Sequence, residues 1–94
     1  MENMQRKVCI VDDDQDILGM YKMRFEQEGY EVVTAMDGEA GLALIRSANP
    51  DIVLLDLQMP KMDGVSMLDA LNKDPKLVMI PVIVLSNNNT DQMF

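Results

Sequence analysis

Short runs of apolar residues alternate along the chain with segments in which apolar residues recur every three or four positions. The short runs are typical of β-strands, which we expect at residues 8–11, 31–35, 52–55 and 81–86. The periodic segments predict three amphipathic helices, over residues 15–28, from 38 to about 47, and from 63 or 64 to about 71. The last two strands show no polar alternation, which favours an α/β fold with a parallel sheet covered on both faces.

In such a sheet the crossovers are right-handed, and the functional crevice lies beyond the carboxyl ends of the strands. Asp12 and Asp13 follow the first strand, Asp56 follows the third, and Ser86 ends the fourth. If the first and third strands are neighbours, three carboxylates converge in one pocket. Carboxylates that lie close together repel one another, which is costly unless a cation binds between them. Oxygen ligands without histidine favour Mg²⁺ or Mn²⁺.

Each of these polar residues also has a simpler explanation. A run of three aspartates, residues 12–14, is more often a helix cap with solvated charges than a ligand cluster. A single aspartate such as Asp56, or a hydroxyl such as Ser86, is common after a strand. The metal-site hypothesis depends on all of them falling at carboxyl ends of strands.

The composition removes several classes of function. The 94 residues suit one domain, and the formal net charge of −8 disfavours direct binding to nucleic acid or to an anionic membrane. The sequence has no histidine, which excludes imidazole catalysis and histidine ligation of a metal. Its one cysteine, Cys9, lies in an apolar run and fits a reducing compartment, and no stretch approaches the roughly 20 apolar residues of a membrane span. We therefore expect a cytoplasmic protein.

Three motifs together resemble a known family. The segments VCIVDDDQDIL, DIVLLDLQMPKMDG and PVIVLS are similar, in order and separation, to the receiver domain of bacterial response regulators. The resemblance covers the whole chain and implies a flavodoxin-like, CheY-like fold with strand order 2-1-3-4-5. It also implies that the domain accepts a phosphoryl group from a histidine kinase or a histidine phosphotransfer protein in a two-component phosphorelay, and is not a turnover enzyme.

The resemblance assigns a role to each polar residue at the strand ends. Asp56 matches the phosphoacceptor, which also contacts the metal. Asp13 matches the direct Mg²⁺ ligand, and Asp12 matches an acidic neighbour that acts mostly through water. Gln58 matches the residue whose backbone carbonyl completes the metal site. Ser86 matches the hydroxyl that contacts the phosphoryl group and moves during switching.

One feature of the family pattern has no counterpart here. The family continues past the fourth strand with a helix, a fifth strand that carries a lysine, and a last helix, whereas this sequence ends at Phe94. We therefore expect a single receiver domain over residues 1–94, incomplete at its C-terminus, with strand order 2-1-3-4. The alternative function is a shortened, receiver-derived module that binds Mg²⁺ or mediates assembly and signals poorly.

An acid-metal phosphohydrolase needs a second acid two residues after its nucleophile, and Gln58 occupies that position, so this class is set aside.

A fourth strand at the edge of the sheet would leave the backbone and apolar side chains of residues 82–85 open to water. This arrangement favours a homodimer, joined through the fourth-strand edge or by exchange of the C-terminal segment.

Overall fold

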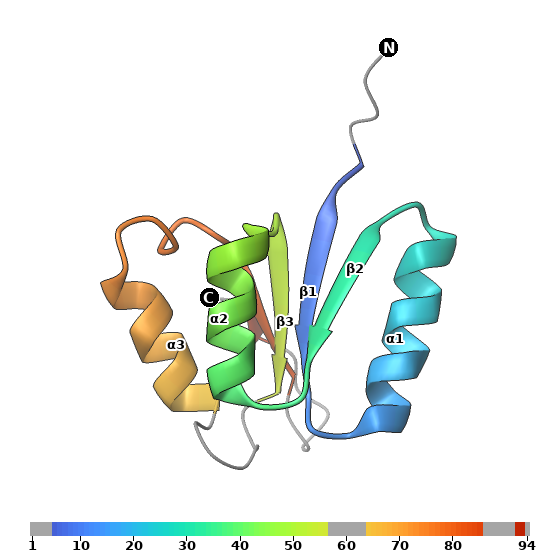
Figure 1. Ribbon diagram of the computed structural model, residues 1–94, viewed down its shortest axis with the longest axis horizontal. Helices are drawn as coiled ribbons and strands as arrows, with labels where there is room; N and C mark the ends of the chain where they lie inside the picture. Colours follow the sequence, from blue (N-terminus) through green and yellow to red (C-terminus); the bar gives the residue numbers. More distant parts are fainter. Residues whose placement is uncertain (1–4, 57–63, 86–91, 94) are drawn as a thin grey trace.

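The expected alternation of strands and helices is present. The computed structural model describes residues 5–56, 64–85 and 92–93 (Figure 1). The elements in chain order are β1 (Lys7–Val11), α1 (Gln15–Gln27), β2 (Glu31–Ala35), α2 (Gly38–Ala48), β3 (Ile52–Asp56), α3 (Gly64–Lys73), β4 (Val82–Leu85) and β5 (Gln92–Met93). Among these residues no helix has the length and apolar character needed to cross a membrane.

Side-chain caps set where the first two helices begin. The Asp14 carboxylate accepts hydrogen bonds from the backbone N–H groups of Asp16 and Ile17, at 2.9 and 3.2 Å. Asp37 does the same for α2, where it accepts from the N–H of Ala40 at 2.8 Å. Since the first N–H groups of a helix have no partner within the helix, these aspartates stabilise both helix starts. The predicted cap at Asp14 is confirmed.

The same helices end at residues whose backbone leaves the helical region. Gly29 follows α1 with a φ of 95°, which glycine adopts without steric cost. Asn49 caps α2 with a φ of 52°, in the left-handed conformation that asparagine tolerates better than most residues. The chain then turns back to start the next strand in each case.

The sheet has the order β2-β1-β3-β4-β5, and its first four strands are parallel. The predicted order 2-1-3-4 is therefore confirmed. Figure 1 shows α1 on one side of the sheet and α2 with α3 on the other, so the domain has three layers. This follows from right-handed crossovers: the connection from β1 to β2 runs one way across the sheet and those from β2 to β3 and from β3 to β4 run the other way, which places helices on both faces.

The core divides at the sheet because successive strand residues point to opposite faces. On the α1 side, the buried residues are Val8, Ile10, Leu18 and Leu54. On the other side, α2 and α3 cover the larger cluster, which comprises Cys9, Val11, Ala35, Leu42, Ile45, Val53, Leu55, Met67, Leu71, Leu77, Val82 and Val84. Both faces of the central strands β1 and β3 are thus buried, as their unbroken apolar sequences predict.

The expectation for the fourth-strand edge was wrong in part. Val82 and Val84 are buried, while Ile83 and Leu85 are half-buried and pack against the α1-side core. The backbone edge also has a neighbour, because β5 pairs with β4 in antiparallel register at Ile83 and Val84. A two-residue antiparallel strand is not the longer parallel fifth strand of the family pattern, and nothing in the sequence pattern indicated it.

Candidate metal centre

Strand register brings the predicted acidic residues together. Val11 of β1 is the register partner of Leu55 of β3, and Asp12 and Asp56 are the residues that follow these partners. Asp12 also extends the pairing of β1 with β2, since its N–H donates to the carbonyl of Ala35 at 3.1 Å. The two carboxylates therefore project from adjacent strands at one end of the sheet.

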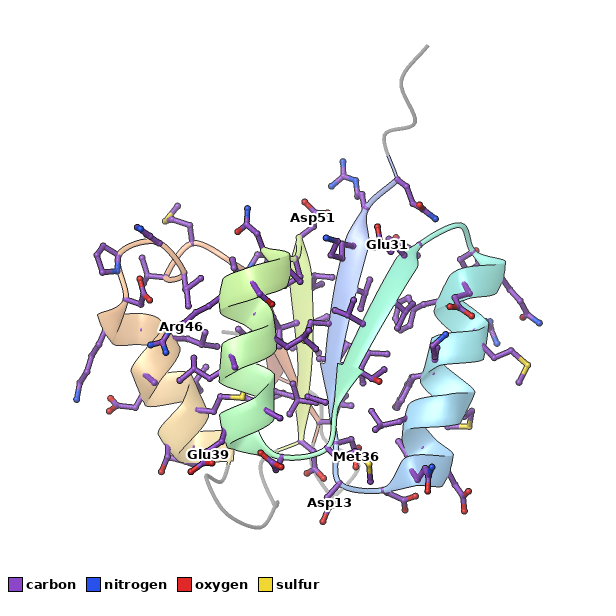
Figure 2. All side chains as sticks on the ribbon, in the orientation of Figure 1. Asp13, Glu31, Met36, Glu39, Arg46 and Asp51 are labelled. Carbon is purple, nitrogen blue, oxygen red and sulfur yellow. The ribbon has the colours of Figure 1, made fainter. Side chains whose placement is uncertain are left out.

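Asp13 joins them from the start of the loop after β1. One carboxylate oxygen from each of Asp12, Asp13 and Asp56 can be chosen so that all three lie within 4.8 Å of one another. The side chains differ in environment, because Asp12 is 3% and Asp56 is 9% exposed while Asp13 is exposed. Figure 2 shows Asp13 at this end of the sheet with Met36 and Glu39, opposite the end that carries Glu31 and Asp51.

The geometry and the donor atoms fit a hard divalent cation. Ligand oxygens of an octahedral Mg²⁺ ion lie about 2.1 Å from the metal, so they are about 3 Å apart when adjacent and about 4.2 Å apart when opposite. Closing a spread of 4.8 Å to these distances requires each carboxylate oxygen to move by about one ångström or less, which side-chain rotation allows. The donor set is all oxygen, which suits Mg²⁺ or Mn²⁺ and not a softer metal. The residues present therefore fit the expected cation.

Asp12 and Asp14 show that the run of three aspartates serves two purposes at once. Asp12 Oδ1 accepts a hydrogen bond from the N–H of Asp14 at 2.9 Å, and Asp14 in turn caps α1. The helix-cap explanation is confirmed for Asp14. Asp12 and Asp13 lie close to Asp56, and the binding of a metal by these residues stays a prediction. The hydrogen bond from Asp14 to the Asp12 carboxylate was not foreseen, although an aspartate two residues before a helix cap is a known turn signal.

Electrostatics at this end of the sheet oppose ionisation of Asp12. Burial raises the pKa of its carboxyl above the ordinary value, and the hydrogen bond from the Asp14 N–H lowers it in part. The charges of Asp56, Asp13 and Asp14 raise the pKa further. A bound cation would remove this penalty, because it offsets both the desolvation and the repulsion.

Two of the expected site residues lie outside the residues that the structure describes. These are Gln58, expected to offer its backbone carbonyl, and Ser86, expected to contact the phosphoryl group. Their roles stay predictions.

Gly41, to which the sequence pattern assigned no role, lets α2 pack closely behind the acidic cluster. A Cβ atom at Gly41 would lie 2.9 Å from Cγ2 and 3.0 Å from Cγ1 of Val11, and 3.2 Å from Sδ of Met67. Val11 immediately precedes Asp12, so the helix rests directly on the end of the strand that carries the site. A glycine on the apolar face of a predicted helix is the sequence signal for such a close approach.

Two hollows lined by described residues lie away from the acidic cluster. Two adjoining hollows of about 660 and 610 Å³ share Arg46, Asp74 and Lys76, beside the last turn of α2. Arg46 Nε lies 3.6 Å from an Asp74 carboxylate oxygen across this region. Cations in the last turn of a helix balance its dipole, which accounts for Arg46 and Lys73 without a ligand.

Comparison with known proteins identifies the family. The family model for the response regulator receiver domain matches residues 8–94, and the chain belongs to this family. The chain is 34% identical over 83 residues to the alkaline phosphatase synthesis transcriptional regulatory protein PhoP of Bacillus subtilis, an alignment that covers 88% of this chain and 34% of that protein. It thus spans about a third of the length of the curated relatives that it matches.

Solved structures agree with this assignment. The receiver domain of the Francisella response regulator 1452 superposes with a TM-score of 0.82 at 37% identity, over 92% of this chain and 69% of that one. The chemotaxis protein CheY4 of Vibrio cholerae superposes with a TM-score of 0.80 at 32% identity, over 85% of this chain and 67% of that one. The expected flavodoxin-like, CheY-like fold is confirmed. Receiver domains act as phosphoacceptors in two-component signalling, which is the class of function that this family defines.

Proposed function

We propose that Asp56 accepts a phosphoryl group from a phosphohistidine on a histidine kinase or a histidine phosphotransfer protein, in a Mg²⁺-dependent step. The observation that carries the proposal is the register of Val11 with Leu55, after which Asp12 and Asp56 leave adjacent strands beside Asp13. Asp56 ends a strand that is buried on both faces, so its carboxylate has a rigid support. Rigid placement of a nucleophile lowers the entropic part of the barrier.

The three carboxylates have different roles in this proposal. An oxygen of Asp56 attacks phosphorus as the bond from phosphorus to the donor imidazole nitrogen breaks, and the imidazole keeps the electron pair of that bond. Asp13 and Asp56 would hold the cation directly, Asp12 would act mostly through water, and the backbone carbonyl of Gln58 would complete the set. A bound cation would supply positive charge to the phosphoryl oxygens. Ser86 would contact the transferred group and move as its charge is added.

The surface around the acidic cluster supports a protein donor. Met36 follows β2 and Val65 lies in the first turn of α3, at the same end of the sheet as the cluster, and both are exposed. On α1, which begins beside Asp13, Met20 and Met23 are also exposed. Exposed large apolar side chains near a polar site favour protein contacts, and Met36 and Val65 lie nearer to the cluster than Met20 and Met23, which lie further along α1. These residues would contact the donor while Asp56 reacts.

The test is phosphorylation of the 94-residue protein by a small acyl phosphate, followed by intact-mass measurement and peptide mapping. The expected result is one phosphoryl group on Asp56, added only when Mg²⁺ is present. Asp56→Asn should remain unlabelled, and Asp13→Asn should behave like the wild type in EDTA because it keeps the nucleophile and loses a ligand. Asp16→Asn is the matched control, since it removes an exposed acid at the same end of the sheet. Labelling of Asp56→Asn to the wild-type level would disprove the assignment.

The alternative function, a Mg²⁺-binding module without phosphoacceptor activity, gives a different result in the same experiment. Mg²⁺ would then shift the amide resonances of residues 12, 13 and 56, while neither the small donor nor a kinase labelled Asp56. We expect weak binding of Mg²⁺, because water fills most coordination positions in sites of this kind.

We also propose that two copies associate through the edge of the sheet formed by β4 and β5. Among the described residues, β5 pairs with only Ile83 and Val84 of the four residues of β4. A short edge pairing of this kind is easily extended or exchanged between copies.

A further inference from the structure

Short hydrogen bonds connect the end of β1 to the first turn of α1. The Asp12 N–H donates to Ala35, and Asp12 Oδ1 accepts from the Asp14 N–H at 2.9 Å. Asp14 Oδ1 then accepts from the N–H groups of Asp16 and Ile17, and its carbonyl accepts from Leu18 at 3.0 Å. Asp13 lies between two residues that are both held in place.

The cap keeps the helix start from competing for the carboxylates of the cluster. The first N–H groups of a helix need an acceptor, and in the absence of Asp14 the next carboxylates before the helix are those of Asp12 and Asp13. Asp14 occupies two of these donors, which leaves Asp13 exposed beside the cluster. The cap also fixes the extended backbone of Asp14, with φ −93° and ψ 111°, in the conformation in which its N–H meets Asp12.

We propose that Asp14 is a positioning residue for the acidic cluster: by capping α1 it orients Asp12 and leaves Asp13 available to a divalent cation. This inference rests on the proposed metal-binding role of the cluster. It assigns Asp14 no contact with the cation. Residues that orient ligands in this way typically change metal affinity by 10–100-fold when they are replaced.

The experiment separates the cap from the charge of Asp14. Asparagine caps a helix about as well as aspartate but carries no charge. Alanine has neither the capping oxygen nor the charge. Titration with Mg²⁺ alone, followed by amide chemical shifts, should show about tenfold weaker binding for Asp14→Ala. Asp14→Asn should lose no more than about threefold, the effect of one screened charge near the site. Hydrogen exchange at Asp16 and Ile17 should accelerate in Asp14→Ala only.

Asp37 provides the matched control, because it caps α2 at the same end of the sheet. Asp37→Ala and Asp37→Asn should bind Mg²⁺ equally well, even though the alanine variant is less stable. Equal affinities for Asp14→Ala and Asp14→Asn would overturn the positioning role and leave the metal site intact. A difference between the two Asp37 variants as large as that at Asp14 would also overturn it, since any loosened helix start would then have the effect. A wild-type protein that shows no response to Mg²⁺ would overturn both the metal assignment and this inference.

Discussion

Asp12 and Asp56 leave neighbouring parallel strands one residue beyond the register pair Val11 and Leu55, and both side chains are almost completely buried. Two carboxylates in this position repel one another, and the charge of Asp56 is one of the causes that raise the pKa of Asp12. We expect the fold without a bound cation to be less stable than the same fold with one of these charges removed. We therefore expect the acidic cluster to cost stability in the absence of a cation, as is common for preorganised sites.

Asp12→Asn should increase the free energy of unfolding in EDTA at neutral pH by roughly 0.5–2 kcal/mol. Asparagine keeps the oxygen that accepts from the Asp14 N–H and removes the buried charge. Because the folded-state pKa of Asp12 is raised, wild-type stability is lost as pH rises above the ordinary aspartate value of about 4. The advantage of the variant should thus vanish at lower pH.

Urea unfolding between pH 3 and 7 checks this expectation. Glu39→Gln is the control, since it removes an exposed charge at the same end of the sheet and should change stability by less than about 0.5 kcal/mol. A destabilised Asp12→Asn at neutral pH in EDTA would show that Asp12 is not under electrostatic strain.

Cys9 should be inert in the folded protein. Burial raises the pKa of its thiol to about 12, and the thiolate is the reactive form. Alkylation at pH 8 should be slow in native buffer and fast in urea, as measured by intact mass. Above about pH 9 the unfolded chain ionises at Cys9 while the folded chain does not, so wild-type stability should fall relative to Cys9→Ala by up to about 1.4 kcal/mol per pH unit. Rapid native alkylation at pH 8 would contradict its burial.

Two glycines in helices should respond differently to alanine. A Cβ atom at Gly19 in α1 would meet no atom within 4 Å other than those of its own stretch of helix, so Gly19→Ala should add about 0.5–1 kcal/mol to the free energy of unfolding. Gly41→Ala gains the same helix propensity but places its Cβ 2.9 Å from Val11, a stiff side chain, and should gain less or be destabilised. Thermal and urea unfolding of both variants provides the comparison. An equal gain at both positions would mean that Val11 shifts freely.

The proposed dimer should depend on salt. The net charge of −8 opposes association, so added salt should strengthen it. Sedimentation velocity at several protein concentrations and salt levels measures this directly. Ile83→Lys, on the half-buried face of β4, should weaken association, whereas Met79→Lys at an exposed position should not. A monomer at high protein concentration and high salt would contradict the proposal.

Local residue patterns determined most of the elements. The apolar runs and the three- to four-residue periodicity predicted all three helices and the first four strands to within about two residues. Asp14 and Gly29 marked the two ends of α1, because caps and left-handed positions depend only on neighbouring backbone groups. The placement of aspartates at strand ends also followed from the sequence alone, and the resemblance to receiver domains supplied the strand order.

Only the tertiary structure decided which of these residues meet. The register of β1 with β3 places Asp12 beside Asp56, and it depends on side chains packed from both faces of the sheet, far apart in sequence. The burial of Asp12, the contact of Gly41 with Val11 and the pairing of β5 with β4 are likewise contacts between distant segments. A local pattern specifies how a segment folds and which face is apolar. The partner of that face is set by how all segments pack together, because close packing permits few arrangements of the whole core.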